Sequence, residues 1–62
     1  MPFITIDLFE GRDIDTKREL VKTLTAETCK ILGCQPDAVH IRFNNVPRED
    51  WATAGTLWAD KS

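Results

Sequence analysis

The 62-residue sequence predicts an α/β fold, namely a small β-α-β protomer with two parallel strands, one amphipathic helix and a short C-terminal hairpin, which assembles through its sheet. Three observations carry this prediction. An alternating apolar run opens the chain, a stretch of helical periodicity follows it, and a second alternating run comes after the helix. A strand, a helix and a strand within so few residues form a βαβ unit, whose crossover is right-handed and whose strands are parallel.

The first strand is expected over residues 3–9, where β-branched and aromatic residues alternate with period two. One face carries Ile4, Ile6 and Leu8. The other face is not wholly polar, because Phe3 and Phe9 lie on it, and these rings need cover from something such as another subunit. A Glu-Gly-Arg turn follows the strand.

The helix is expected to begin after its N-cap, Asp13, and to run to Leu32, with Gly33 as the residue that ends it. Asp15 adds negative charge to the first turn, where the helix dipole favours it. The stripe at helical spacing consists of Leu20, Val21, Leu24, Thr28, Ile31 and Leu32. The charged residues expected mostly on the opposite, solvated side are Lys17, Arg18, Lys22, Glu27 and Lys30.

The second strand follows a turn at residues 34–37 and repeats the alternation of the first. Its inward positions are Val39, Ile41 and Phe43, and its outward positions are His40, Arg42 and Asn44. The tail, residues 45–58, is rich in turn residues and has no helical period. We expect a short hairpin around Ala54-Gly55, and a packing role against a neighbouring subunit for Trp58.

A chain of this length forms one domain, residues 1–62, that is only marginally stable alone. The helix covers one face of the two-stranded sheet, and nothing in the sequence covers the other face. A hydrophobic fraction of 42% is high for so short a chain unless part of that surface is buried between subunits. Oligomerisation is therefore the expected source of stability.

Charge and composition argue against several classes of protein. The net charge of −2 and the pI near 5.1 argue against a nucleic-acid-binding surface. There is no apolar run of the roughly 20 residues that a membrane span needs, and no signal-peptide pattern, so a cytoplasmic protein is expected. Cys29, Cys34 and His40 lack metal-ligand spacing, so no metal site is expected. The two cysteines are expected to be reduced thiols rather than a bridge.

Pro2 raises the question of chemistry, because it directly follows the initiator methionine. Removal of Met1, which a small second residue permits, would make Pro2 a free secondary amine. An ordinary α-amine has a pKa of about 7.7–8.0, and burial beside aromatic side chains or nearby arginines lowers the pKa of such a group. A neutral amine near pH 7 is a useful general base. The alternative is that Pro2 merely begins an edge strand.

Four other residues are candidates for a site. Arg12 follows Gly11 at the carboxyl end of the first strand, where parallel sheets often bind ligands, and its guanidinium suits a carboxylate. His40 and Arg42 point the same way from the second strand, so either is placed to join a site on that face. Trp51 is either an apolar wall or a subunit-packing residue. For Arg12 and His40, simple solvent exposure is the alternative.

The ordered set of motifs resembles the 4-oxalocrotonate tautomerase family over essentially the whole chain. The set comprises Met-Pro, a short strand, Glu-Gly-Arg, an amphipathic helix, a second strand and Val-Pro-Arg-Glu-Asp-Trp. The resemblance implies β-α-β protomers whose dimers assemble into hexamers, with no metal or cofactor. It implies an isomerase that moves a proton in an enol or keto carboxylic acid such as 2-hydroxymuconate, in the breakdown of aromatic compounds.

The resemblance also implies roles for individual residues. Pro2 is the base, and Arg12 reaches in from a neighbouring subunit to bind a substrate carboxylate. Trp51 walls the site and keeps the pKa of the proline low. Where the family has a second arginine, this chain has His40, and Arg42 lies two residues further along the same face, roughly 6–7 Å away. Either residue supplies the second contact, or the substrate has only one carboxylate.

Two functional alternatives follow from the same residues. One is a non-catalytic assembly module of the same fold that keeps Met1, in which Pro2 is an ordinary amide. The other is a hydratase or decarboxylase of unsaturated or keto acids that uses the same proline. For the assembly itself, a dimer is the alternative to the hexamer.

Overall fold

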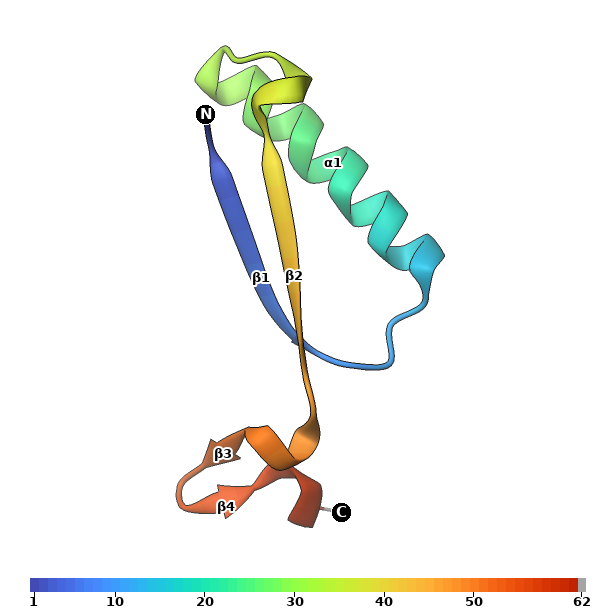
Figure 1. Cartoon of the computed structure of the whole chain (residues 1–62), viewed down its shortest axis with the longest axis vertical. Helices are drawn as coiled ribbons and strands as arrows, with labels where there is room; N and C mark the ends of the chain where they lie inside the picture. The colour runs from blue at the N-terminus through green and yellow to red at the C-terminus, as the bar shows by residue number, and fades with distance from the viewer. Residues whose placement is uncertain (62) are drawn as a thin grey trace.

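The computed structural model describes residues 1–61 and contains the expected βαβ unit (Figure 1). β1 (Phe3–Phe9) and β2 (His40–Val46) pair in parallel, in register from the first residue of each strand to the last. α1 (Ile14–Leu32) connects the two strands and lies along one side of them. The α/β prediction is therefore confirmed, and so are the bounds of the first strand and of the helix. The second strand begins one residue later than predicted and includes Asn45 and Val46, which the prediction had assigned to the tail.

Side-chain burial follows the predicted alternation along both strands. The half-buried positions that alternate along them are Ile4, Ile6, Leu8, Ile41 and Phe43. Phe3, by contrast, is 75% exposed, and His40, Arg42 and Asn44 are exposed as well. The apolar set thus faces α1, and the opposite face of the sheet is open.

Both ends of α1 are capped as the sequence predicts. Asp13 has extended backbone angles, and its carboxylate accepts a hydrogen bond from the backbone N–H of Thr16 at 2.8 Å. Hydrogen bonds from the hydroxyl and the backbone N–H of Thr16 hold the pKa of this carboxyl below its usual value. Gly33 adopts the left-handed conformation (φ 71°), and its N–H donates to the carbonyl of Cys29 at 2.8 Å.

The last turn of α1 departs from the prediction. Ile31 and Leu32 are 77% and 62% exposed, whereas Leu20, Val21 and Leu24 are half-buried against the sheet. α1 crosses the strands obliquely, so its C-terminal end lies beyond the amino end of β1 (Figure 1). The strands do not reach beneath this end, which leaves the apolar stripe exposed there.

Lys17 is also placed differently from the prediction, which put it on the solvated side. It is half-buried, its Nζ donates to Oδ1 of Asn45 at 2.9 Å, and the same atom lies 5.4 Å from the ring centre of Phe43. Lys17 precedes Leu20 and Val21 by three and four positions, so helical geometry puts it on the apolar stripe. Its aliphatic stem covers the sheet while its ammonium reaches a polar side chain of β2.

A short η1 turn (Pro36–Ala38) leads from the helix into β2, and a C-terminal arm, residues 47–61, follows β2. The arm contains η2 (Arg48–Asp50), β3 (Ala52–Thr53), β4 (Thr56–Leu57) and η3 (Trp58–Asp60). β3 and β4 are antiparallel and joined by Ala54 and Gly55, whose φ values of 54° and 80° suit a tight hairpin turn. The predicted hairpin is confirmed.

Within residues 1–61 no side chain is fully buried. The radius of gyration is 15.0 Å, compared with about 11 Å for a compact domain of this length. The protomer measures 43 × 23 × 13 Å, so it is a slab one helix and one sheet thick. In the same range, no helix combines the length and the apolar character that a membrane span requires.

Candidate active site

Pro2 lies at the amino end of β1, directly before the first strand residue, and is half-buried. Its carbonyl oxygen accepts a hydrogen bond from the backbone N–H of His40 at 3.0 Å. This bond extends the β1–β2 pairing by one step and ties Pro2 to the sheet. Proline has no N–H to donate, so at the very start of a strand it removes no hydrogen bond from the β-ladder.

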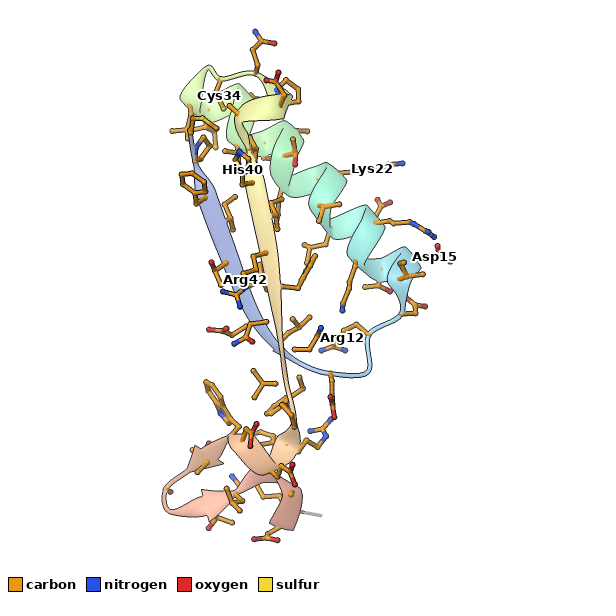
Figure 2. All side chains as sticks on the ribbon, viewed as in Figure 1. Arg12, Asp15, Lys22, Cys34, His40 and Arg42 are labelled. Carbon is orange, nitrogen blue, oxygen red and sulfur yellow. The ribbon has the colours of Figure 1, made fainter. Side chains whose placement is uncertain are left out.

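The ring of His40 lies on the open face of the sheet, beside the ring of Phe3. The two ring centroids are 5.1 Å apart and the planes differ by 25°, so the rings stack. Arg42 occupies the next outward position of β2, where it pairs in register with Thr5 (Figure 2). The structure thus brings Pro2 and His40 together and places Arg42 one step further along the same face.

Arg12 lies in the loop that follows β1, and its side chain is exposed (Figure 2). Gly11 precedes it with a φ of 114°, a conformation that favours glycine, so the chain turns sharply at this point. Pro2 and Arg12 stand at opposite ends of a strand about 23 Å long. One protomer does not bring them together, and a site that contains both must take them from two chains.

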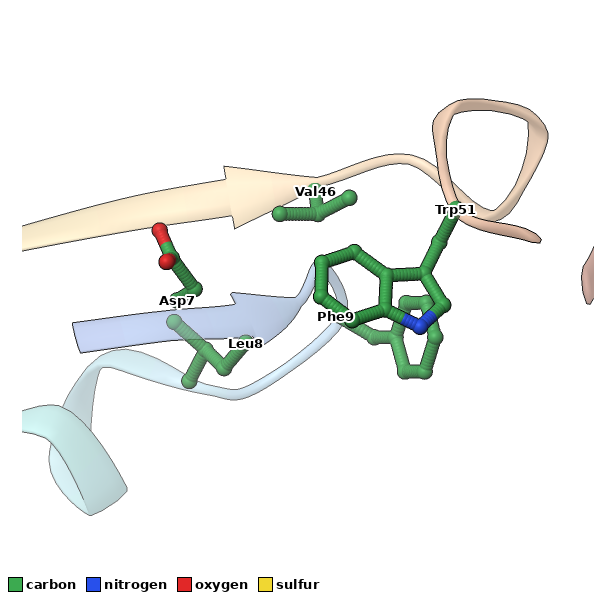
Figure 3. Close-up of a pocket in the computed structure, with 5 residues that line it drawn as sticks. All are labelled: Asp7, Leu8, Phe9, Val46 and Trp51. Carbon is green, nitrogen blue, oxygen red and sulfur yellow. The ribbon is translucent and has the colours of Figure 1, made fainter. Parts of the chain in front are cut away.

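A shallow pocket of about 160 Å³ opens at the carboxyl end of the sheet (Figure 3). Its lining residues are Asp7, Leu8, Phe9, Val46 and Trp51. The ring of Phe9 contacts Trp51 edge-on, with centroids 6.3 Å apart and planes at 83°. Trp51 therefore walls a pocket, but within one protomer this pocket lies at the end of the sheet away from Pro2.

Arg48 is not among the residues that the sequence predicted for a site. Its guanidinium carbon lies 4.8 Å from the ring centre of Phe9, which lines the pocket. The available signal was its position two residues after the end of β2, since the carboxyl ends of parallel strands are common ligand sites. That signal is weak, because many exposed arginines follow strands.

Among the described residues, the charged side chains at the strand ends have no ion-pair partners. Within residues 1–61, the one ion pair at contact distance joins Arg18 to Asp15, at 2.9 Å. The guanidinium groups of Arg12, Arg42 and Arg48 are therefore free to bind an external anion.

The two cysteines lie at the end of α1, away from this pocket. Both are free, and their Sγ atoms are 3.9 Å apart, longer than the roughly 2.05 Å of a disulfide bond. Partial desolvation and the neighbouring Cys34 thiol raise the pKa of Cys29, which makes its thiol a poor nucleophile at neutral pH. Within the described residues, no three or more His, Cys, Asp and Glu side chains are grouped to hold a metal ion.

Comparison with known proteins gives one consistent family. The family model described as "Tautomerase enzyme" matches residues 2–61. The chain is 37% identical over 57 residues to a probable tautomerase of Streptococcus pneumoniae, covering 92% of this chain and 95% of the relative. It is 30% identical over 61 residues to a probable tautomerase of Ralstonia nicotianae, covering 98% and 94%.

Solved structures give the same result for the fold. A crystal structure of a 4-oxalocrotonate tautomerase homologue is similar with a TM-score of 0.95 and 37% identity, over 100% of this chain and 98% of the other. A heterohexamer 4-oxalocrotonate tautomerase from Chloroflexus aurantiacus is similar with a TM-score of 0.89 and 26% identity, over the whole of both chains.

Proposed function

The chain belongs to the tautomerase family, and on this premise we propose that Pro2 is the general base of a keto–enol isomerase. Family membership itself indicates an isomerase. The proposed substrates are small enol or keto carboxylic acids, with 2-hydroxymuconate as the example, and residues 1–62 form the single domain that acts on them.

The observation that carries the proposal is the placement of Pro2. It is half-buried at the amino end of β1 and tied to the sheet by the hydrogen bond from His40, so its nitrogen has a fixed position. Once Met1 is removed, that nitrogen has a basic lone pair. It takes the proton of the 2-hydroxyl group, and the electron pair of that oxygen–hydrogen bond becomes the second bond of the carbonyl. The electron pair of the conjugated carbon–carbon double bonds shifts to the substrate carbon that takes the proton back from the amine. The carbonyl accepts the charge, so the step uses no metal or cofactor.

The rest of the proposed site comes from a neighbouring subunit. Arg12 and Trp51 lie at the other end of the protomer, so a second copy must bring them to Pro2. Arg12, with His40 or Arg42, binds the carboxylate and stabilises the charge that builds on oxygen. The indole of Trp51 excludes water and favours the neutral amine.

The proposed assembly is a hexamer built as a trimer of dimers. The open sheet face and the lack of fully buried side chains in residues 1–61 support association. The heterohexameric tautomerase of Chloroflexus aurantiacus, which is similar over the whole chain, supports the number six.

The test combines the intact mass of the untagged protein with turnover of 2-hydroxymuconate by the same sample. We expect a mass without Met1, and we expect Pro2→Ala to lower kcat by about 10²-fold or more, the usual range for loss of a general base. Pro36→Ala is the matched control, because it makes the same change in the η1 turn outside the proposed site. It should leave turnover close to that of the wild type.

Other outcomes of this test separate the alternatives. Retained Met1 in the natural protein contradicts the proposal, because an amide nitrogen is not basic, and leaves a non-catalytic assembly module. Processed protein that hydrates or decarboxylates unsaturated or keto acids, and leaves the enol untouched, indicates a different reaction of the same amine.

A further inference from the structure

Two arginines follow the carboxyl ends of the two paired strands. Phe9 and Val46, the last residues of β1 and β2, are register partners. Arg12 follows the first by three residues, and Arg48 follows the second by two. The carboxyl ends of adjacent parallel strands are a favoured place for ligands, and here the pocket beside Trp51 opens at that edge.

The guanidinium of Arg48 is held by an aromatic ring rather than by a carboxylate. It lies 4.8 Å from the centre of Phe9, and Phe9 is itself fixed by Trp58, with centroids 5.1 Å apart, and by Trp51 at 6.3 Å. A cation–π contact uses none of the N–H donors of a guanidinium. The contact with Phe9 therefore positions Arg48 without engaging its hydrogen-bond donors.

The acidic side chains at this edge do not neutralise the arginine. Asp7 lines the pocket, Glu10 directly follows β1, and Asp50 is the last residue of η2. Within residues 1–61, none of them forms an ion pair with an arginine, since the one such pair is in α1. An external anion would therefore meet a positioned cation that has no competing carboxylate at contact distance within residues 1–61.

Lys61 in the C-terminal arm provides a comparison for Arg48, because its cation contacts an aromatic ring outside the pocket. The Nζ of Lys61 lies 4.6 Å from the ring centre of Trp58, and Trp58 does not line the pocket. Arg48 contacts Phe9, which does. The two residues share the arm and the type of contact but differ in whether their ring belongs to the pocket wall.

We infer that Arg48 is a second carboxylate-binding residue of the site that Arg12 serves, and that it makes this site prefer a diacid to the same carbon chain with one carboxylate. The inference rests on the proposed function, because it assigns a specificity role within the same site. Arg12 binds the carboxylate beside the reacting enol, and Arg48, from the adjacent strand end, binds the far one. His40 then need not supply the second charge that the family's usual arginine provides.

The test measures the binding of two matched ligands to the assembled protein by calorimetry. trans,trans-Muconate and sorbate are both six-carbon dienes, with two carboxylates and one, and neither has the hydroxyl group that the reaction requires. Loss of the charge-assisted hydrogen bonds in Arg48→Gln should raise the Kd of muconate by about tenfold and leave that of sorbate within about twofold. Lys61→Gln, the matched control, should change neither.

Two further variants decide the remaining cases. Arg48→Lys keeps the charge but loses the planar fork, so it should fall between wild type and Arg48→Gln for muconate, and this rescue also shows that the fold is intact. Equal weakening of both ligands, no weakening of muconate, or the same effect from Lys61→Gln would contradict the inference. Muconate binding does not need the base, so Pro2→Ala should keep the preference for muconate over sorbate. A wild type that shows this preference but has no isomerase activity would refute the proposed reaction and leave the role of Arg48 standing.

Discussion

At the scale of the residue, the open face of the sheet is organised around His40. Its backbone N–H holds Pro2 and its ring stacks on Phe3, so the residue is fixed from two sides. Arg42 is exposed on the same face and has no carboxylate at ion-pair distance among the described residues. Because its side chain is long and untethered, orienting it on a substrate costs conformational entropy that His40 has already lost.

This difference predicts which of the two residues serves the reaction. His40→Asn should raise KM for 2-hydroxymuconate and lower kcat, with kcat/KM falling by about tenfold, as expected for one lost hydrogen bond at a charged group. Arg42→Gln should change kcat/KM by no more than about twofold, typical of an exposed charge. Steady-state kinetics on both variants checks this, and the reverse order of effects would assign the role to Arg42.

At the scale of the element, α1 is fixed by local chemistry at its ends and by the length of the sheet along its side. Asp13 and Gly33 could be predicted from sequence because caps depend on neighbouring residues only. The exposure of Ile31 could not, because it depends on how far the strands reach beneath the helix. The placement of Lys17 follows from its position on the helical stripe rather than from its charge, because its long stem lets the ammonium reach Asn45 from the sheet side of the helix.

The same distinction applies to the candidate site. Pro2, Arg12 and Trp51 could be proposed from their places along the chain and from the family resemblance. The contact of Arg48 with Phe9 joins residues far apart in the sequence and has no local pattern. The sequence alone also did not show that Pro2 and Trp51 lie at opposite ends of one protomer.

The N-cap predicts a pH dependence of stability. The hydrogen bonds from Thr16 lower the folded-state pKa of Asp13, so this carboxylate stabilises the fold above its unfolded-state pKa of about 3.9. That contribution is lost as the pH falls through the lower, folded-state pKa. Asp13→Asn keeps a capping oxygen but does not titrate.

Denaturant unfolding of both proteins from pH 7 to pH 2, at one protein concentration, measures this difference. The wild type should be more stable than Asp13→Asn near neutral pH, and the gap should close in the acid range below pH 4. A gap that is constant across the whole range would show that the charge of Asp13 does not contribute.

At the scale of the whole molecule, the protomer has more surface than a folded chain of its mass should have. Its accessible area is 4951 Å², against about 4,000 Å² for a compact monomer. The excess, about 900 Å², is close to the roughly 800 Å² that each partner buries in a standard interface. The exposed apolar residues that could supply such an interface include Phe3, Ile14, Ile31, Leu32 and Leu57.

This surface predicts that folding and assembly are linked. Raising the protein concentration from about 1 to 100 μM should raise Tm by several degrees, because association stabilises only the folded chain. Thermal melts across that range, combined with light-scattering mass on the same samples, check the prediction. A monomeric mass with a Tm independent of concentration would contradict it.

The separation of Pro2 and Arg12 at the two ends of β1 also has a genetic consequence. If each site takes its proline from one chain and its arginine from another, an allele that loses Pro2 and an allele that loses Arg12 damage different halves of the same site. In mixed assemblies of the two gene products, some sites combine the intact Arg12 of the first product with the intact Pro2 of the second. Two inactive alleles would therefore complement one another in a cell that carries both, whereas two alleles defective in the same half would not.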